Sequence, residues 1–494
     1  MGKRKELARG SATVSVITFV GHILSTALKL LVSRNFGLIG FGQYSLIMAF
    51  SRFLSTVVQM GFHQSIVHFV SKFRTAGDWT NVKHFFVSGL LHILKVSLVL
   101  ILVLILFKDI ILNHIDLENG GLYALIFIWA ISTIIAINNF ISGTLRSLKL
   151  FKEQAILFTS SFPALMILAL LGLLIMGADL STVYQFLTFG VLLNVLLLVL
   201  MFIFTLKKFE AADRPPAGKE NLNVLVKYSL PIWLSSTFQS ASRNSDRIML
   251  GIFSSISQVA IYGAGMTFSI LFAFPLKAMS PVFQPAIIEH YASKDYAGIN
   301  QLYNTMVRWS SLFVIPALSV LICFGDQLIR AFGKGFEGAY AVMIILSIAQ
   351  SISTIAGIAG TMLDMTEKQA SHAKIMIYGF VFVIILNLLL IPRFGAVGAA
   401  VASALSILAN NVFRVRKLIK YYSLKTDYGI VIKLILKFTP LVLTSSWIMN
   451  QALIHWSILL VIYLVISMGM VYGSLSARER YSVLALLRKS SLAP

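Results

Sequence analysis

Long apolar runs separated by short polar segments dominate this sequence. A run of about 18 to 25 apolar residues is long enough to cross the ~30 Å hydrocarbon core of a bilayer as a helix. Such runs lie near residues 11–33, 43–70, 85–107, 121–145, 154–177, 181–206, 224–250, 257–285, 306–324, 338–362, 373–391, 395–413, 430–449 and 453–475. The pattern therefore predicts an all-α polytopic membrane protein with about 14 transmembrane helices.

The longest polar break between these runs, KKFEAADRPPAGKENLN, contains a Pro-Pro-Ala-Gly turn and divides the chain. Turn-forming and charged residues are typical of a linker between two packed parts. We therefore expect an N-terminal six-helix lobe, a cytoplasmic linker, a C-terminal six-helix lobe, and two extra transmembrane helices with a basic cytoplasmic tail. Their predicted bounds are 1–206, 207–223, 224–417 and 418–494, respectively.

A modest internal repeat supports the two lobes. At an offset of 218 residues, the matching pairs are Tyr44 with Tyr262, Met48 with Met266, and Phe50 with Phe268. The same offset sets Lys29 against Arg247. An even number of helices per lobe gives both lobes the same orientation, which predicts a parallel pseudo-twofold repeat about an axis normal to the membrane.

Composition and charge agree with a membrane protein. Hydrophobic residues make up 57% of the chain and charged residues only 12%, which is outside the range of soluble domains. The net charge is +22, but the basic residues gather in alternate loops with a roughly fivefold bias, which predicts cytoplasmic N- and C-termini. The positive charge thus reflects topology rather than nucleic-acid binding.

The single cysteine, Cys323, excludes an internal disulfide or CxxC site, and no cofactor or metal is expected.

Basic residues inside the predicted spans are the candidate binding groups, because an ionised side chain at the bilayer centre costs about 2.5 to 3.5 kcal/mol. By helical rise, Arg52 and Lys95 lie near the midplane, where a long side chain hardly reaches water. Lys29, Arg243 and Arg247 lie near the outer interface, where snorkelling explains them equally well.

Asp246 is the one acidic residue well within a predicted span. It is three residues from Arg243 and adjacent to Arg247, so we expect a charge pair with an arginine on the same helix face. One carboxylate cannot neutralise both arginines, and Arg52 and Lys95 have no acidic partner in their predicted spans. Such an excess of buried positive charge favours an anion, and arginine suits phosphate oxygens.

Several stretches resemble a known family. These are LLVSRNFGLIGFGQYSL at 30–46, YSLPIWLSS at 228–236, SDRIMLGIF at 245–253 with VAIYGAG at 259–265, and IPRFGAVGAAVAS at 391–403. They are similar to segments of the polysaccharide transporter branch of the multidrug/oligosaccharidyl-lipid/polysaccharide flippase superfamily. Each motif alone is loose, but their order and spacing cover nearly the whole chain.

The resemblance implies a flippase that carries an anionic, polyprenyl-pyrophosphate-linked oligosaccharide from the inner to the outer leaflet of the cell membrane. Two lobes would alternate around a cationic cavity, in which Arg52 and Lys95 hold pyrophosphate or acidic sugars and Lys29 faces Arg247. Arg243 and Asp246 would form a pair that modulates them, with Asp246 the one candidate for cation coupling. Polysaccharide polymerases and glycosyltransferases are further candidate partners.

Three other functions stay open at this point. A cation-coupled multidrug antiporter of the same fold should line its cavity with acidic and aromatic groups, whereas the charges inside the predicted spans are mainly basic. A membrane-embedded polyprenyl-sugar glycosyltransferase or polymerase generally needs a large external loop and paired acid and base groups, which the sequence does not offer. A passive scramblase or channel is compatible with the sequence.

Overall fold

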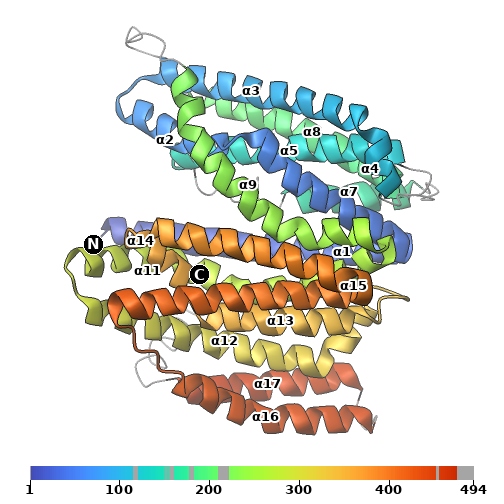
Figure 1. The fold of residues 1–494 in the computed structure, drawn as a ribbon, viewed down its shortest axis with the longest axis vertical. Coiled ribbons are helices and arrows are strands. Elements are labelled where there is room, and N and C mark those ends of the chain that lie inside the picture. Colours follow the sequence, from blue (N-terminus) through green and yellow to red (C-terminus); the bar gives the residue numbers. More distant parts are fainter. Residues whose placement is uncertain are drawn as a thin grey trace, which may run out of the picture. The chain divides into compact units, whose positions relative to one another are not determined.

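The computed structural model describes residues 2–114, 121–150, 153–154, 161–176, 183–209, 222–451 and 455–475 (Figure 1). The regular elements within these residues are helices. They are α1 (Gly2–Gln59), α2 (Phe62–Thr75), α3 (Trp79–Leu106), α4 (Lys108–His114), α5 (Gly121–Ser147), α7 (Ser161–Ile175), α8 (Val183–Lys207), α9 (Leu222–Phe253), α10 (Ile256–Ser269), η3 (Ile270–Ala273), α11 (Phe274–Ala292), α12 (Tyr296–Arg330), α13 (Ala339–Ile355), α14 (Ala359–Met365), α15 (Gln369–Tyr422), α16 (Gly429–Asn450) and α17 (Trp456–Ser474).

The helices form two compact units. The first unit comprises Met1–Ala264, Ala331–Ala339 and Met376–Ser403, and the second comprises Gly265–Arg330, Tyr340–Ile375 and Ala404–Pro494. In the first unit α2, α3, α5 and α8 pack together, and in the second α12 packs against α11, α16 and α17 (Figure 1). The boundaries of the units cut through α10 and α15, so the lobes expected from the sequence stay a prediction.

Two of the longest helices reverse direction at a glycine. In α1 the break is at Gly37 (φ 64°, ψ −164°), and in α15 it is at Gly395 (φ 52°, ψ −130°). Both φ values lie in the left-handed region, which glycine adopts at little cost. A straight helix of the 54 residues of α15 would measure about 80 Å, far more than a bilayer requires. Helix α15 therefore holds the predicted runs 373–391 and 395–413. Helix α1 holds the run 11–33 and the first part of the run 43–70, which continues into α2.

Nine helices in the described part of the chain are long and apolar enough to cross a membrane, or ten if the bent pair α13 and α14 forms one span. This count is lower than the predicted number for identifiable reasons. The hairpins α1 and α15 each count once although each turns back on itself. Helix α7 has 15 residues and is too short to be counted. Helix α9, which contains the charged residues Arg243, Asp246 and Arg247, is not counted. The all-helical class is confirmed, while about 14 spans remain a prediction.

The core of the first unit is rich in phenylalanine. Phe69 stacks on Phe85 with ring centroids 5.2 Å apart, and Phe86 stacks on Phe140 at 5.8 Å. All four rings are buried. Leucines instead cover much of the exposed face of α3, among them Leu98, of which 59% is exposed. Exposed leucines are expected where a helix faces lipid, because lipid tails and leucine are equally apolar.

Gly61 lets α2 lie directly against α9. It has a φ of +76°, and a Cβ atom there would lie 2.5 Å from the carbonyl oxygen of Ser229. Beside this contact the Ser229 hydroxyl donates to the Ser65 hydroxyl at 2.7 Å. A side chain at position 61 must therefore both strain the backbone and separate the two helices.

We expect Gly61→Ala to destabilise the purified protein by about 2 to 3 kcal/mol, because it combines left-handed strain with a steric clash. Thermal unfolding in detergent measures the effect. Gly172→Ala in α7 is the matched control, since nothing lies within 4 Å of a Cβ atom there and alanine favours a helix. Equal unfolding temperatures for Gly61→Ala and the unmodified protein would contradict the close contact.

Candidate functional site

Three basic side chains of the first unit lie near one another: Lys29 and Arg52 of α1, and Arg247 of α9. Lys29 interacts electrostatically with both arginines, and the two arginines interact with each other. In a straight helix Lys29 and Arg52 would be about 35 Å apart. The reversal at Gly37 brings them within reach, so the backbone of α1 builds this basic cluster of Lys29, Arg52 and Arg247.

Arg247 is the buried member of the basic cluster, with 8% of its surface exposed. Its Nη2 donates to Asn244 Oδ1 at 2.9 Å, while its Nε has no hydrogen-bond partner among the described residues. An unused donor on a buried guanidinium is costly, and an anion that accepts a hydrogen bond from Nε relieves that cost. Arg247 thus keeps one donor available for an anionic oxygen.

A hydrogen bond between Ser240 and Arg52 also joins α9 to α1. The Ser240 hydroxyl donates to the Arg52 carbonyl oxygen at 3.2 Å, and Asn244 Nδ2 donates to the Ser240 carbonyl oxygen at 2.9 Å. Asn244 thus links Arg247 to this contact. The Arg52 side chain itself is exposed, so the cluster combines one buried and one accessible guanidinium.

Asp246 is held by neutral donors. Its carboxylate accepts hydrogen bonds from the Tyr262 hydroxyl at 2.6 Å, from Asn387 Nδ2 at 2.8 Å, and from the Ser403 hydroxyl. Only 4% of Asp246 is exposed. We expected a charge pair with Arg243, but both carboxylate oxygens are directed to α10 and α15 instead. The negative charge therefore stays next to Arg247 without a direct bond to it.

The reversal of α15 makes this carboxylate site possible. Asn387 and Ser403 would be about 24 Å apart in a straight helix, yet both reach Asp246 because α15 turns at Gly395. Gln258 of α10 secures the turn, since its Oε1 accepts a hydrogen bond from the backbone N–H of Ala396 at 2.8 Å. One reversed helix thus supplies two of the three donors.

The other two predicted basic residues are exposed. Lys95 lies on α3 beside Leu91 and Leu98, on the face opposite the buried Ile93. Arg243 lies on α9, one turn before Arg247. Electrostatic interactions link Lys29, Arg52 and Arg247, and the roles expected for Lys95 and Arg243 stay predictions.

The sequence interpretation missed Tyr262, Asn387 and Ser403 as partners of Asp246. Tyr262 had been noted only as the repeat partner of Tyr44. Asn387 is a polar residue inside the apolar run 373–391, and Ser403 ends the motif at 391–403. A polar residue in an apolar run was the available signal, although it does not identify its partner. Within the described residues, no three His, Cys, Asp or Glu side chains gather as metal ligands.

Residues 7–287 match the profile of the family described as "Polysaccharide biosynthesis protein", and residues 231–389 match the profile described as "MatE". The first match covers more than half of the chain. It includes all of the basic cluster and Asp246, and the second includes Asp246 and Asn387.

Curated relatives and a solved structure are also similar to this chain. The probable low-salt glycan biosynthesis flippase Agl15 of Haloferax volcanii is 28% identical over 45% of this chain and 48% of its own length. The probable flippase AglR of the same organism is 26% identical over 52% and 56%, respectively. The chain thus spans about half the length of these relatives. An inward closed structure of the lipid II flippase MurJ superposes with a TM-score of 0.70 at 14% identity, over 93% of this chain and 98% of that one, which shows a shared multi-pass membrane fold.

Proposed function

Because this chain belongs to the polysaccharide biosynthesis protein family of the multidrug/oligosaccharidyl-lipid/polysaccharide flippase superfamily, whose members are membrane transporters and not enzymes, we propose that it translocates a polyprenyl-pyrophosphate-linked oligosaccharide. The single observation that carries this proposal is the basic cluster of Lys29, Arg52 and Arg247. Its charges repel one another, and a pyrophosphate offers the multiple anionic oxygens that relieve this repulsion.

The direction and mechanism form the second part of the proposal. The substrate enters from the inner leaflet and leaves to the outer leaflet as two six-helix lobes alternate in opening, with both termini cytoplasmic. The internal repeat supports two equivalent lobes, because its offset sets the break at Gly37 against residues 254–255, where α9 gives way to α10. Lys29 and Arg247 then come from equivalent positions of the two lobes.

A multidrug antiporter is the alternative suggested by the match to the MatE family. Such a protein exports cations, which a cluster of three basic side chains repels. Asp246 offsets only part of this positive charge, because one carboxylate stands against three basic side chains. The basic cluster therefore favours an anionic substrate over a cationic drug.

Asp246 is our candidate for coupling transport to a cation gradient. It is buried in the first unit, and protonation of its carboxylate would change the hydrogen bonds that join α9 to α10 and α15. A proton or sodium gradient imposed across vesicles should then accelerate transport by the unmodified protein and not by Asp246→Asn. Equal acceleration of both would exclude Asp246 from coupling.

Reconstitution in sealed vesicles tests the substrate. We expect a fluorescent oligosaccharide on polyprenyl pyrophosphate to become accessible on the opposite leaflet faster than the same glycan on a neutral polyprenyl carrier. Vesicles without protein give the background rate. Transport of cationic dyes with no movement of the pyrophosphate-linked glycan would overturn the proposed function while leaving the fold unchanged.

A further inference from the structure

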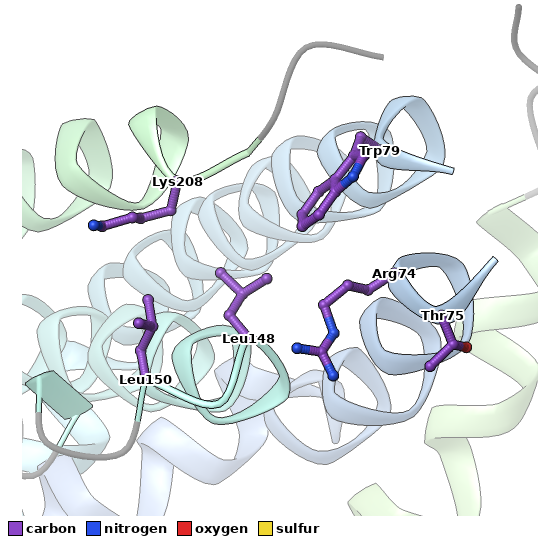
Figure 2. A pocket seen from close by; sticks show the side chains of 6 residues that line it. All are labelled: Arg74, Thr75, Trp79, Leu148, Leu150 and Lys208. Carbon is purple, nitrogen blue, oxygen red and sulfur yellow. The ribbon is translucent and has the colours of Figure 1, made fainter. Parts of the chain in front are cut away.

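A pocket of about 440 Å³ lies at one end of the first unit, where α2, α5 and α8 end and α3 begins (Figure 2). No residue of the basic cluster lines it. The residues that line it are Arg74, Thr75, Trp79, Leu148, Leu150 and Lys208. The pocket therefore combines two cationic side chains with an aromatic and two aliphatic ones.

The cationic side chains of the pocket border it on two sides. In the view of Figure 2, Arg74 and Trp79 lie on one side of Leu148, and the Lys208 side chain lies on the other side. The Lys208 amine also lies 5.1 Å from the centroid of the Phe204 ring. Arginine in this setting offers a planar fork of donors, and lysine adds a point charge, so together they suit a phosphate group.

The described acidic side chain next to the pocket, Asp78, caps a helix and forms no ion pair with the pocket cations. Asp78 is occupied at the start of α3, where its carboxylate accepts from Asn81 N at 3.0 Å and from Asn81 Nδ2 at 2.7 Å. Among the described residues, no carboxylate forms an ion pair with Arg74 or Lys208. Further basic residues stand on the same helix ends, namely Lys72, Lys83, Arg146, Lys149 and Lys207.

Apolar side chains also cover the exposed face of α8, the helix that ends next to Lys208. Leu196, Leu200 and Ile203 lie along α8 and are 58%, 55% and 44% exposed, respectively. They form an apolar face of the kind that contacts lipid. Tryptophan and basic side chains at helix ends are typical of the membrane interface, and basic pockets between spanning helices bind lipid head groups.

We propose that this pocket binds the head group of an anionic phospholipid, with Arg74 and Lys208 on two sides of it and the acyl chains beside Trp79, Leu148 and Leu150. A soluble phosphate would use the two charges and leave the apolar lining uncovered. A phospholipid uses both. The site is separate from the basic cluster, so lipid binding here does not depend on which substrate the protein transports.

The test compares two double variants of the full-length protein in detergent. Arg74→Gln with Lys208→Gln removes both charges that line the pocket, and Lys72→Gln with Lys207→Gln removes two neighbouring charges that do not. Binding is measured by native mass spectrometry and by the lipid-dependent rise in unfolding temperature, using phosphatidylglycerol, phosphatidylcholine or inorganic phosphate. The unfolding temperature without lipid checks that each variant is folded.

We expect phosphatidylglycerol to bind the unmodified protein and the Lys72, Lys207 variant alike, and to bind the Arg74, Lys208 variant about 30-fold more weakly. Phosphatidylcholine and inorganic phosphate should stabilise none of the three. Equal phosphatidylglycerol affinity in all three proteins, or an equal loss in both variants, would overturn the proposal. Stabilisation by inorganic phosphate as strong as by phosphatidylglycerol would overturn it as well, in favour of a soluble phosphorylated ligand.

Discussion

Replacing Arg247 with alanine is expected to slow glycan translocation about 100-fold, since a charge-assisted hydrogen bond contributes about 3 kcal/mol. Arg247 is buried, its Nη2 is bound to Asn244, and its Nε is left without a partner among the described residues. The substrate would therefore lose a preorganised donor rather than a mobile surface charge. The rate of appearance of labelled glycan on the opposite leaflet of vesicles gives the measurement.

Two further variants separate charge, geometry and folding. Arg52→Ala should cause a similar loss with little effect on stability, because the Arg52 side chain is exposed. Arg247→Lys keeps the charge but loses the planar fork, so we expect an intermediate rate. Lys95→Ala is the matched control, since it removes a basic residue of similar predicted depth outside the basic cluster. Unchanged transport by Arg247→Ala and Arg52→Ala at equal protein abundance would refute the cluster as the binding site.

The contrast between Arg52 and Lys95 shows how far the sequence could predict this site. Helical rise gives the depth of a residue along its helix, and both residues fall near the midplane by that measure. Depth does not give the direction in which a side chain points. Arg52 joins Lys29 and Arg247, whereas Lys95 lies among exposed leucines of α3. The sequence thus predicts which basic residues lie within the spans, but it does not predict which of them come together.

The hydrogen-bond partners of Asp246 could not be predicted from the sequence, for a different reason. Spacing along α9 correctly sets Asp246 beside both arginines, but it describes neighbours on one helix only. The carboxylate binds across to Tyr262, Asn387 and Ser403. Two of these are brought together by the reversal at Gly395, where the sequence predicts a break between the runs 373–391 and 395–413. Hydrophobic length does not show which polar side chains of the two runs then lie close together. The apolar runs themselves did predict the helices, because hydrophobic length is a one-dimensional property.

Asp246→Ala should be the most destabilising substitution in the first unit, at about 3 to 5 kcal/mol, because it leaves Arg247 buried without a neighbouring negative charge. It also removes the acceptor for the Tyr262 hydroxyl and Asn387 Nδ2, both of which are buried. Thermal unfolding of the purified protein in detergent measures the loss. Asp246→Asn should lower the stability less. Its amide oxygen can still accept a hydrogen bond from one of the three donors, whereas its amide nitrogen can accept none from the others.

Variants of the residues that donate hydrogen bonds to Asp246 show how much stability each of these bonds contributes. Tyr262→Phe and Ser403→Ala each remove one hydrogen bond to a carboxylate that keeps two others, so each should cost about 1 to 2 kcal/mol. The effect of the two combined should differ from the sum, because they share one acceptor. If Asp246→Ala unfolded at the same temperature as Tyr262→Phe, the carboxylate would be a replaceable acceptor. A loss larger than that of the three hydrogen bonds together instead means that its charge offsets Arg247, and that the basic cluster is tolerated in the empty protein because this one buried anion stands beside it.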